Sequence, residues 1–442
     1  MKVLKTFRGG VHPQDSKSYT RDKAIVEMPV PKKVVIPVSQ HIGAPGIPVV
    51  KVGDDVKKGQ LIAYNDTFIT SSVHASTSGK VVDIGVYPSS YKNESLAIVI
   101  ESDGLDEWAP GLPLHRDWES LDIKEIHQIV RDSGIVGLGG ANFPSHIKIS
   151  YGPEKKIDTF ILNGAECEPY LNGDYRIMVE HTERLAAGVK IAMKSLNVKR
   201  GIVGIEDNKP EAVKAMTEAL KGTDVQVVAV PTKYPQGAER MLIKVLAERE
   251  IPAGKRHSDI GVVGMNVCTI HSVANAVISG IPLIERVVTV AGDAVAEPMN
   301  VMVRIGTSFK DVIEFCGGLT KTPDKIINGG PMMGYAQGSM EVPVVKGVAG
   351  ILAMTKEALC DGEEEACIRC GRCVEACPIG LIPSMLSILG ERGRYEEAKE
   401  KFGILNCIEC GSCSYVCPAK RNIVQYIRYL KNLNWEHSPH HK

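Results

Sequence analysis

The residues of this 442-residue chain with the most specific chemistry are cysteines, and eight of the twelve lie in one C-terminal segment. They form two copies of the pattern C-x2-C-x2-C-x3-C-P, at residues 367–378 and 407–418. In each copy three thiolates fit on one tight loop, whereas the fourth, which precedes a proline, points toward a neighbouring site. This spacing predicts two [4Fe–4S] clusters, each held by three cysteines of one copy and the last cysteine of the other. Site one then comprises Cys367, Cys370, Cys373 and Cys417, and site two comprises Cys407, Cys410, Cys413 and Cys377.

Two zinc sites of four cysteines each are the alternative, but structural zinc sites usually combine two C-x2–4-C pairs and lack the fourth Cys-Pro. The crowding of the cysteines also argues against a disulfide framework, which is typical of small secreted chains, and it indicates a reducing compartment. An isolated cysteine is more often a small buried apolar residue than a ligand. On that ground no role is expected for Cys167, Cys268, Cys316 and Cys360.

A second candidate site begins with a glycine-rich segment, residues 134–144, which is followed by Lys148. Glycine lets the backbone approach a phosphate or a flat ring closely, and the N–H groups of such a loop can donate hydrogen bonds to it. A glycine cluster alone is as often an ordinary turn, and this spacing is not the GxGxxG of dinucleotide-binding folds. Residues 163–169, 234–240 and 264–269 each follow an apolar run typical of a strand. Because loops after parallel strands are where α/β sheets bind ligands, these segments are expected to belong to one site.

Together the four segments resemble the FMN- and NADH-binding subunit of respiratory complex I and its relatives in NAD-reducing hydrogenases. The resemblance implies non-covalent FMN held by Gly137, Gly139, Gly140, Lys148, Asn163 and Asn266, with Thr269 close to them. It also implies that the flavin face and the nicotinamide nucleotide lie beside Phe143, Glu166, Glu168, Tyr234, Gly237 and Glu239. The chain departs from that family at Leu138, Ala165 and Ala238, where an arginine, an aspartate and a glutamate are usual. Without the resemblance, each of these glutamates would be interpreted as a solvated surface carboxylate.

Composition and patterning predict several domains. At 442 residues the chain exceeds the ~250–300 residues of one hydrophobic core, and 44% hydrophobic and 24% charged residues are ordinary for globular proteins. The zero net charge argues against nucleic acid as a partner, and no apolar run approaches a signal peptide or a membrane span of ~20 residues.

We expect an α/β and β multidomain fold. Its parts are an N-terminal arm (1–30), a barrel-sandwich hybrid module that resembles lipoyl carriers without their lysine (31–103), a Rossmann-like α/β FMN/NADH domain (115–281), a soluble-ligand-binding β-grasp module (282–352), a helical ferredoxin-like domain for two [4Fe–4S] clusters (355–430) and a tail (431–442).

The order of these parts, with F-R-G-G-V-H-P at residues 7–13, resembles the RnfC family over essentially the whole chain. Members of that family belong to the Rnf complex, an ion-translocating ferredoxin:NAD oxidoreductase. The resemblance implies an enzyme subunit in which FMN exchanges a hydride with NAD(H) and single electrons with the clusters. It implies a peripheral position at the cytoplasmic face of the bacterial cell membrane, without a span of its own. The partners would be other Rnf subunits, including integral membrane subunits, with ferredoxin acting indirectly. The redox chemistry belongs to the cofactors, so no catalytic acid or base is expected.

Two alternatives fit parts of the sequence. One is a soluble cobalamin reductase with similar flavin and cluster parts, and the other is a flavin-free electron-relay or assembly scaffold. The arm at residues 7–13 favours the Rnf family over the first, and the eight-cysteine segment argues against a scaffold without clusters. Assays of FMN, iron and NADH-driven dye reduction would separate the three.

Overall fold

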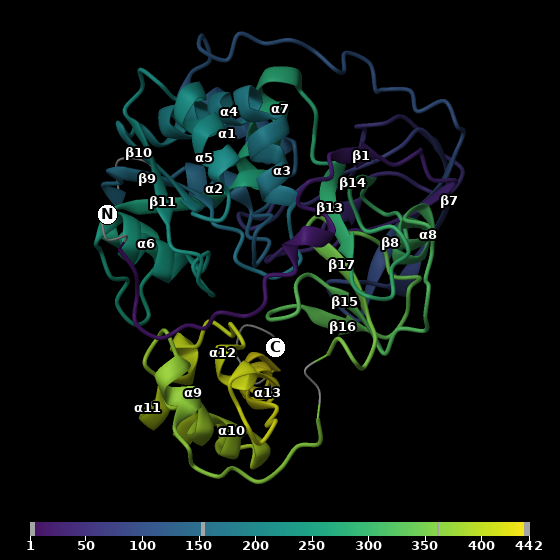
Figure 1. Cartoon of the computed structure of the whole chain (residues 1–442). Coiled ribbons are helices and arrows are strands. Elements are labelled where there is room, and N and C mark those ends of the chain that lie inside the picture. The colour runs from purple at the N-terminus through teal and green to yellow at the C-terminus, as the bar shows by residue number, and fades with distance from the viewer. Residues whose placement is uncertain (1–4, 152–154, 360–361, 437–442) are drawn as a thin grey trace.

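The fold is taken from a computed structural model of the chain, in which residues 5–151, 155–359 and 362–436 are described. Cys360 and the end of the expected tail, from residue 437, lie outside these residues. Figure 1 shows a helical C-terminal unit beneath an α/β unit and two β-rich units, with the N-terminal arm crossing between them. The arm contains a short 3-10 helix, η1 (Lys17–Tyr19), and ends in strand β1 (Ile25–Glu27).

The first β-rich unit consists of two small sheets with the strand orders β2-β8-β7-β4 and β3-β5-β6. Val34 and Ile36 alternate with less buried residues along β2, the period expected of a strand with one face in a core. The strands are β2 (Lys33–Pro37), β3 (Ile47–Pro48), β4 (Asp55–Val56), β5 (Leu61–Tyr64), β6 (Val73–His74), β7 (Gly79–Pro88) and β8 (Glu94–Ser102).

The α/β unit is built on a parallel sheet with the order β11-β10-β9-β12. Its strands are nearly continuous apolar runs because helices cover both faces. Phe160 and Leu162 of β9 join the core that includes α4 and α7, whereas Ile161 joins the core that includes α6. The strands are β9 (Thr159–Gly164), β10 (Arg200–Glu206), β11 (Val225–Val230) and β12 (Val262–Asn266). The helices are α1 (Ile123–Asp132), α2 (Ser145–Ile149), α3 (Gly173–Glu180), α4 (Thr182–Leu196), α5 (Pro210–Ala219), α6 (Glu239–Ala247), η3 (His257–Ile260) and α7 (Val267–Ser279).

The strand order of this sheet creates a switch point between β9 and β12. The chain builds outward from β9 through β10 to β11 and then returns to the other side of β9 to form β12. Connections therefore leave the two central strands in opposite directions, and open α/β sheets bind ligands in the crevice that this opens at the carboxyl ends. Asn163 and Asn266 are register partners at this edge.

The second β-rich unit is a six-stranded sheet with the order β1-β14-β13-β17-β15-β16. Its edge strand β1 comes from the N-terminal arm and pairs in parallel with β14. The buried Phe309 and Val312 of α8 pack into the core of this unit. The elements are β13 (Glu285–Ala291), β14 (Met299–Arg304), α8 (Phe309–Phe315), β15 (Lys325–Asn328), β16 (Tyr335–Gln337) and β17 (Gly350–Met354).

The C-terminal unit is helical, and α10 packs against α13 around the buried Leu386 and Ile427. Each cysteine motif ends its loop with a short helix, α9 in the first and α12 in the second. The last helix continues beyond residue 430, where the domain was expected to end. The elements are α9 (Arg372–Ala376), α10 (Pro383–Glu391), α11 (Tyr395–Phe402), η4 (Ile404–Asn406), α12 (Ser412–Tyr415) and α13 (Ile423–Glu436).

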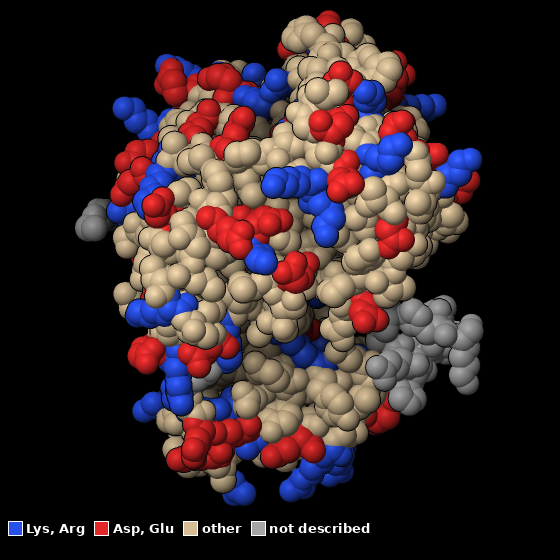
Figure 2. Space-filling view, turned by 90° about the vertical axis from the view of Figure 1, so that its right-hand side faces the viewer, with Lys and Arg blue, Asp and Glu red and all other residues tan. Residues whose placement is uncertain are grey.

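The described residues were compared with what a membrane-spanning protein and a strongly charged surface would require. No helix among them combines the length and the apolar character needed to cross a bilayer. On the face shown in Figure 2, acidic and basic side chains are interspersed, and a recess separates the C-terminal unit from the units above it.

Candidate flavin and iron–sulfur sites

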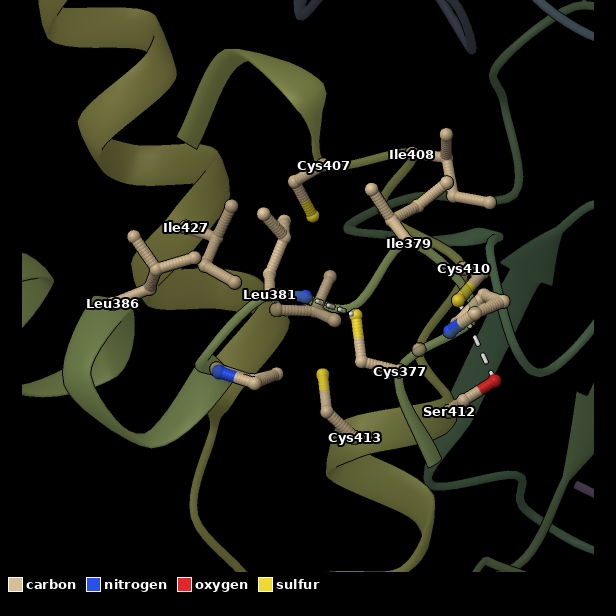
Figure 3. A pocket seen from close by; sticks show the side chains of 14 residues that line it. Cys377, Ile379, Leu381, Leu386, Cys407, Ile408, Cys410, Ser412, Cys413 and Ile427 are labelled. Atoms are coloured by element: carbon tan, nitrogen blue, oxygen red, sulfur yellow. Dashed lines mark hydrogen bonds between the residues drawn. The ribbon is translucent and has the colours of Figure 1, made fainter. Parts of the chain in front are cut away.

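The structure brings the four cysteines of site two around one pocket. Cys407, Cys410 and Cys413 of the second motif line it together with Cys377, the last cysteine of the first motif. Figure 3 shows these side chains surrounding the same space, with Leu381 among the apolar residues of its wall. This is the crossed arrangement that the spacing predicts, in which the fourth cysteine belongs to the other motif.

Hydrogen-bond donors stand beside the sulfurs of site two. The backbone N–H of Leu381 donates to Sγ of Cys377, and that of Glu409 donates to Sγ of Cys407, both over 3.4 Å. Burial raises the pKa of the Cys407 thiol to about 11. A thiolate in such an apolar pocket requires positive charge beside it, which iron would supply. The site is therefore chemically suited to a cluster and costly for a bare thiolate.

The cysteines of site one lie in a more open place. Burial raises the pKa of the Cys373 thiol, and the neighbouring Cys367 and Cys417 thiols raise it further, which places the three close together. The fourth cysteine, Cys370, is exposed. In the part of the chain that the structure describes, no three histidine, cysteine, aspartate or glutamate side chains converge tightly enough to hold a single metal ion. A [4Fe–4S] cube is larger than one ion, so its thiolates stand around it instead of meeting at one point.

The glycine-rich loop expected to hold FMN lies at the carboxyl edge of the parallel sheet, beside the switch point between β9 and β12. The loop is closed by the N–H of Gly137, which donates to the carbonyl of Phe143 over 2.9 Å, and Gly139 and Gly140 are exposed. Gly139 lies directly against β12: a Cβ there would stand 2.8 Å from side-chain atoms of Asn266. A larger residue would displace Asn266, so the close approach requires glycine.

Asn266 is fixed from two sides. Its Oδ1 accepts a hydrogen bond from the N–H of Thr269 over 3.3 Å, which caps α7. Its Nδ2 donates to Oδ2 of Asp174 over 2.5 Å. The hydroxyl of Thr269 in turn accepts a hydrogen bond from the N–H of Leu138 over 2.8 Å, which ties the glycine-rich loop to α7. Asp174 was not singled out from the sequence, since a carboxylate in the first turn of a helix is common.

Further expected residues continue along the same edge. Asn163, the register partner of Asn266, donates through Nδ2 to the carbonyl of Gly237 over 2.8 Å. Lys148 on α2 lies 3.0 Å from Oε1 of Glu239, with which it forms an ion pair. Although burial would raise the pKa of the Glu239 carboxyl, the nearby Lys148 and His257 lower it below its usual value. The structure therefore brings an anionic and a cationic side chain to the same wall.

Glu166 and Glu168 have fixed hydrogen-bond partners. Glu166 accepts hydrogen bonds from the N–H groups of Asp174 and Tyr175 over 2.7 Å and 3.1 Å, at the start of α3. Glu168 accepts hydrogen bonds from the N–H groups of Met332 and Met333 in the second β-rich unit. Burial raises the pKa of both carboxyl groups to about 7. Glu166 thus ties the loop after β9 to the start of α3, and Glu168 ties it to the second β-rich unit.

Tyr234 connects the α/β unit to cysteine site two. Its side chain is 1% exposed, and its hydroxyl donates to the backbone carbonyl of Cys410 over 2.6 Å. The same hydroxyl lies 3.3 Å from Oε1 of Glu168. Tyr234 also packs in a small apolar cluster with Val11 of the arm and Ala376 of the first cysteine motif. The expected flavin loops and the expected cluster site are thus in direct contact.

Two buried lysines, not singled out from the sequence, hold the loop that follows β9. Lys209 donates to the carbonyl of Ala165 over 2.8 Å, and Lys17 of the arm donates to the carbonyl of Glu168 over 3.1 Å. Both lysines are at most 3% exposed. Lysine is almost never fully buried, so sequence composition gives no signal for these positions.

Comparisons with known proteins agree with this arrangement. Residues 5–105 match the RnfC barrel sandwich hybrid domain, and residues 130–275 match the Nuo51 FMN-binding domain. Residues 287–336 match the SLBB domain, and residues 362–418 match the 4Fe-4S dicluster domain. The chain is 60% identical to the RnfC protein of the proton-translocating ferredoxin:NAD(+) oxidoreductase complex of Clostridium ljungdahlii, over 98% of this chain and 94% of that protein. This chain belongs to the RnfC family.

A second RnfC relative, from the Na(+)-translocating ferredoxin:NAD(+) oxidoreductase complex of Acetobacterium woodii, is 44% identical over 96% of each chain. The matches confirm the resemblance, the fold class, the oxidoreductase class and the cofactors expected from the sequence, FMN and two [4Fe–4S] clusters. The fold is also found in a crystal structure of a NAD+-reducing [NiFe]-hydrogenase, with a TM-score of 0.52 at 17% identity. That superposition covers 71% of this chain and 64% of the hydrogenase chain.

Proposed function

We propose that this RnfC protein is the NAD(H)-facing subunit of an ion-translocating ferredoxin:NAD oxidoreductase. It would exchange a hydride between NAD(H) and FMN and single electrons between FMN and its two clusters. The observation that carries the proposal is the path from Asn163 at the carboxyl edge of the sheet to cysteine site two. Asn163 binds Gly237, and three residues earlier in the same loop Tyr234 donates a hydrogen bond to the carbonyl of Cys410. Two redox cofactors held by directly contacting segments can exchange electrons without a mobile carrier.

The FMN site would be formed by residues that already hold one another in place. Bound FMN would supply the conversion between a two-electron hydride and single electrons. Gly139 and Gly140 would let the backbone approach the cofactor, and Asn163 and Asn266 would present amide groups at the carboxyl edge of the sheet. Lys148, already paired with Glu239, would place a cation near the phosphate.

The remaining expected residues would line the side that faces the nicotinamide nucleotide. Gly237 and Phe143 would contribute backbone groups to it, since they bind Asn163 and Gly137. Glu168 and Tyr234 would form the wall shared with cysteine site two. Glu166 would act through Asp174, whose N–H it binds and whose carboxylate holds Asn266. Thr269 would fix the glycine-rich loop.

Assembly with other proteins of the complex is the second part of the proposal. By their names, the two relatives belong to complexes that translocate protons or Na(+) and act on ferredoxin and NAD(+). By this likeness the chain would be peripheral, at the cytoplasmic face of the bacterial membrane. It would contact integral membrane subunits of the complex and receive electrons from ferredoxin through them.

The test is anaerobic purification of the full chain, followed by assays of FMN, iron, sulfide and NADH oxidation. We expect FMN, iron and sulfide for two [4Fe–4S] clusters, and bleaching of flavin and clusters by NADH. Gly139→Ala should lower the FMN content, because the added methyl group would meet Asn266, and should leave the iron content unchanged. Iron without flavin or NADH oxidation would refute the proposal and leave an electron relay.

A further inference from the structure

The N-terminal arm contacts the α/β unit, which is the flavin-binding unit of the proposed function, as well as the second β-rich unit and cysteine site two. Phe7 is 4% exposed and packs in the core beside α6 of the flavin-binding unit. Lys233 of that unit lies 4.4 Å above the ring of Phe7 and donates to its carbonyl over 2.7 Å. Farther along, the arm holds the loop after β9 through Lys17 and then adds β1 to the sheet of the second β-rich unit.

Between these anchors, residues 9–11 lie between the flavin-binding unit and cysteine site two. Val11 and Tyr234 exchange two backbone hydrogen bonds, of 2.8 Å and 2.9 Å. On the other side, the N–H of Gly10 donates to the carbonyl of Ala376 over 2.9 Å. Ala376 directly precedes Cys377, the cysteine that crosses into site two.

The two glycines of the arm make this close approach possible. A Cβ at Gly10 would stand 2.6 Å from the carbonyl oxygen of Tyr234, and a Cβ at Gly9 would stand 2.8 Å from the carbonyl oxygen of Cys377. Both have a positive φ, 78° at Gly10 and 73° at Gly9, which residues with side chains rarely adopt. Any larger residue would therefore push the arm away from Tyr234, from Cys377 or from both.

We propose that residues 7–11 of the arm are positioning residues for electron transfer, which set the separation between the flavin site and the cluster of site two. The inference rests on the proposed function and extends it to a segment outside the flavin and cluster domains. The arm is hydrogen-bonded at once to Tyr234 of the flavin-binding unit and to the backbone beside Cys377. Because electron-transfer rates fall steeply with the distance between cofactors, a displaced arm slows transfer without removing either cofactor.

The experiment compares Gly10→Ala with Gly222→Ala in the full chain, purified anaerobically. Gly222 has the same φ of 78° as Gly10, but a Cβ there would meet nothing within 4 Å, so it controls for backbone strain alone. Stopped-flow spectroscopy with NADH measures reduction of the flavin and then of the clusters, and ferricyanide reduction measures electrons taken from the flavin directly.

For Gly10→Ala we expect cluster reduction to slow severalfold, with flavin reduction and ferricyanide turnover unchanged. Gly222→Ala should match the native chain in all three. Phe7→Ala is the second variant, since it loosens the arm at its anchor beside α6, away from both cofactor sites. Cluster reduction at the native rate in either arm variant, with full FMN and iron content, would overturn the proposal.

Two other outcomes are also informative. Loss of iron from site two in both arm variants would overturn the positioning role, because the arm would then be needed to form the cluster site. Failure of NADH to reduce the flavin in the native chain would refute the proposed function instead. The two failures are therefore distinguishable.

Discussion

Cysteine sites one and two share one sequence pattern but lie in different surroundings. At site two, Cys410 and Cys413 are buried, and the hydroxyl of Tyr234 donates to the Cys410 carbonyl. At site one, Cys370 is exposed, and the neighbouring Ile368 is 65% exposed. The motif thus selects the ligands, whereas the units packed around it decide how far each cluster lies from solvent and from the flavin.

The residues between the cysteines differ in charge as well. Arg369 and Arg372 of the first motif correspond to Glu409 and Ser412 of the second. Glu409 is paired with Arg428 and Lys431 at 3.2 Å and 2.6 Å, so site two also has cations beside it. Reduction adds negative charge to a cluster, which water and nearby cations stabilise. Because Cys370 and Ile368 are exposed, we expect site one to have the higher reduction potential and to be the cluster farther from the flavin.

The largest effect, loss of a whole cluster, is expected from replacing the last cysteine of either motif by serine. Cys377→Ser should remove the cluster of site two and Cys417→Ser that of site one, each with about half of the iron. In Cys377→Ser, NADH should no longer reduce the remaining cluster, because the cluster next to Tyr234 is missing. In Cys417→Ser, NADH should still reduce site two. Iron analysis and electron paramagnetic resonance after addition of NADH measure both.

The reverse outcome would break the comparison. If Cys417→Ser abolished cluster reduction while Cys377→Ser preserved it, site one would be the cluster next to the flavin. Loss of both clusters in either variant would show instead that the two sites do not form independently.

The next effect concerns the reduction potentials. The hydroxyl of Ser412 lies 3.4 Å from Sγ of Cys410 and can donate to the thiolate in a bound cluster. Ser412→Ala removes this donor and should lower the potential of site two by about 40 mV, if the bond contributes about 1 kcal/mol. A redox titration followed by electron paramagnetic resonance measures the shift.

The matched change in the first motif is Arg372→Ser, which gives site one the residue of site two. It removes a cation and should lower the potential of site one, so that the two potentials move closer together. An unchanged potential of site one would mean that Arg372 contributes nothing and that the difference between the two reduction potentials comes from solvent exposure alone.

The cysteine pairing was predictable because the C-x2-C-x2-C-x3-C spacing itself contains the geometry. The proximity of Asn163 and Asn266 follows in the same way, since residues after apolar runs meet at one edge of a parallel sheet. Both features depend on contacts that local patterns determine.

Contacts between distant segments left no such signal. Glu168 binds the N–H groups of Met332 and Met333, more than 160 residues away in the chain. The sequence predicts an extended arm at the three residues of β1, and they form a strand only because they pair with β14. Likewise, nothing in the local sequence around Gly10 indicates that it would lie against both Tyr234 and Ala376. These features arise from packing between units, which a sequence pattern does not record.

The last expected effect is the pH dependence of the reduction potential of site two. Burial raises the pKa of Glu168 to about 7, so this carboxyl group is neutral below that pH and negatively charged above it. It lies 3.3 Å from the Tyr234 hydroxyl, which binds the Cys410 carbonyl. The new charge opposes addition of an electron, so the potential of site two should fall as the pH rises through 7.

The expected fall is on the order of 70 mV, as for a unit charge about 10 Å away at an effective dielectric constant of about 20. Redox titrations one pH unit below and one above the pKa of Glu168 measure it, and the exposed site one is the internal control. In Glu168→Gln the shift at site two should become smaller, because the amide stays neutral and only Glu166, whose pKa burial also raises to about 7, still titrates nearby. Equal shifts at both sites, or an undiminished shift in Glu168→Gln, would show that another group titrates. Ionisation of Glu168 would then have no effect on the reduction potential of site two.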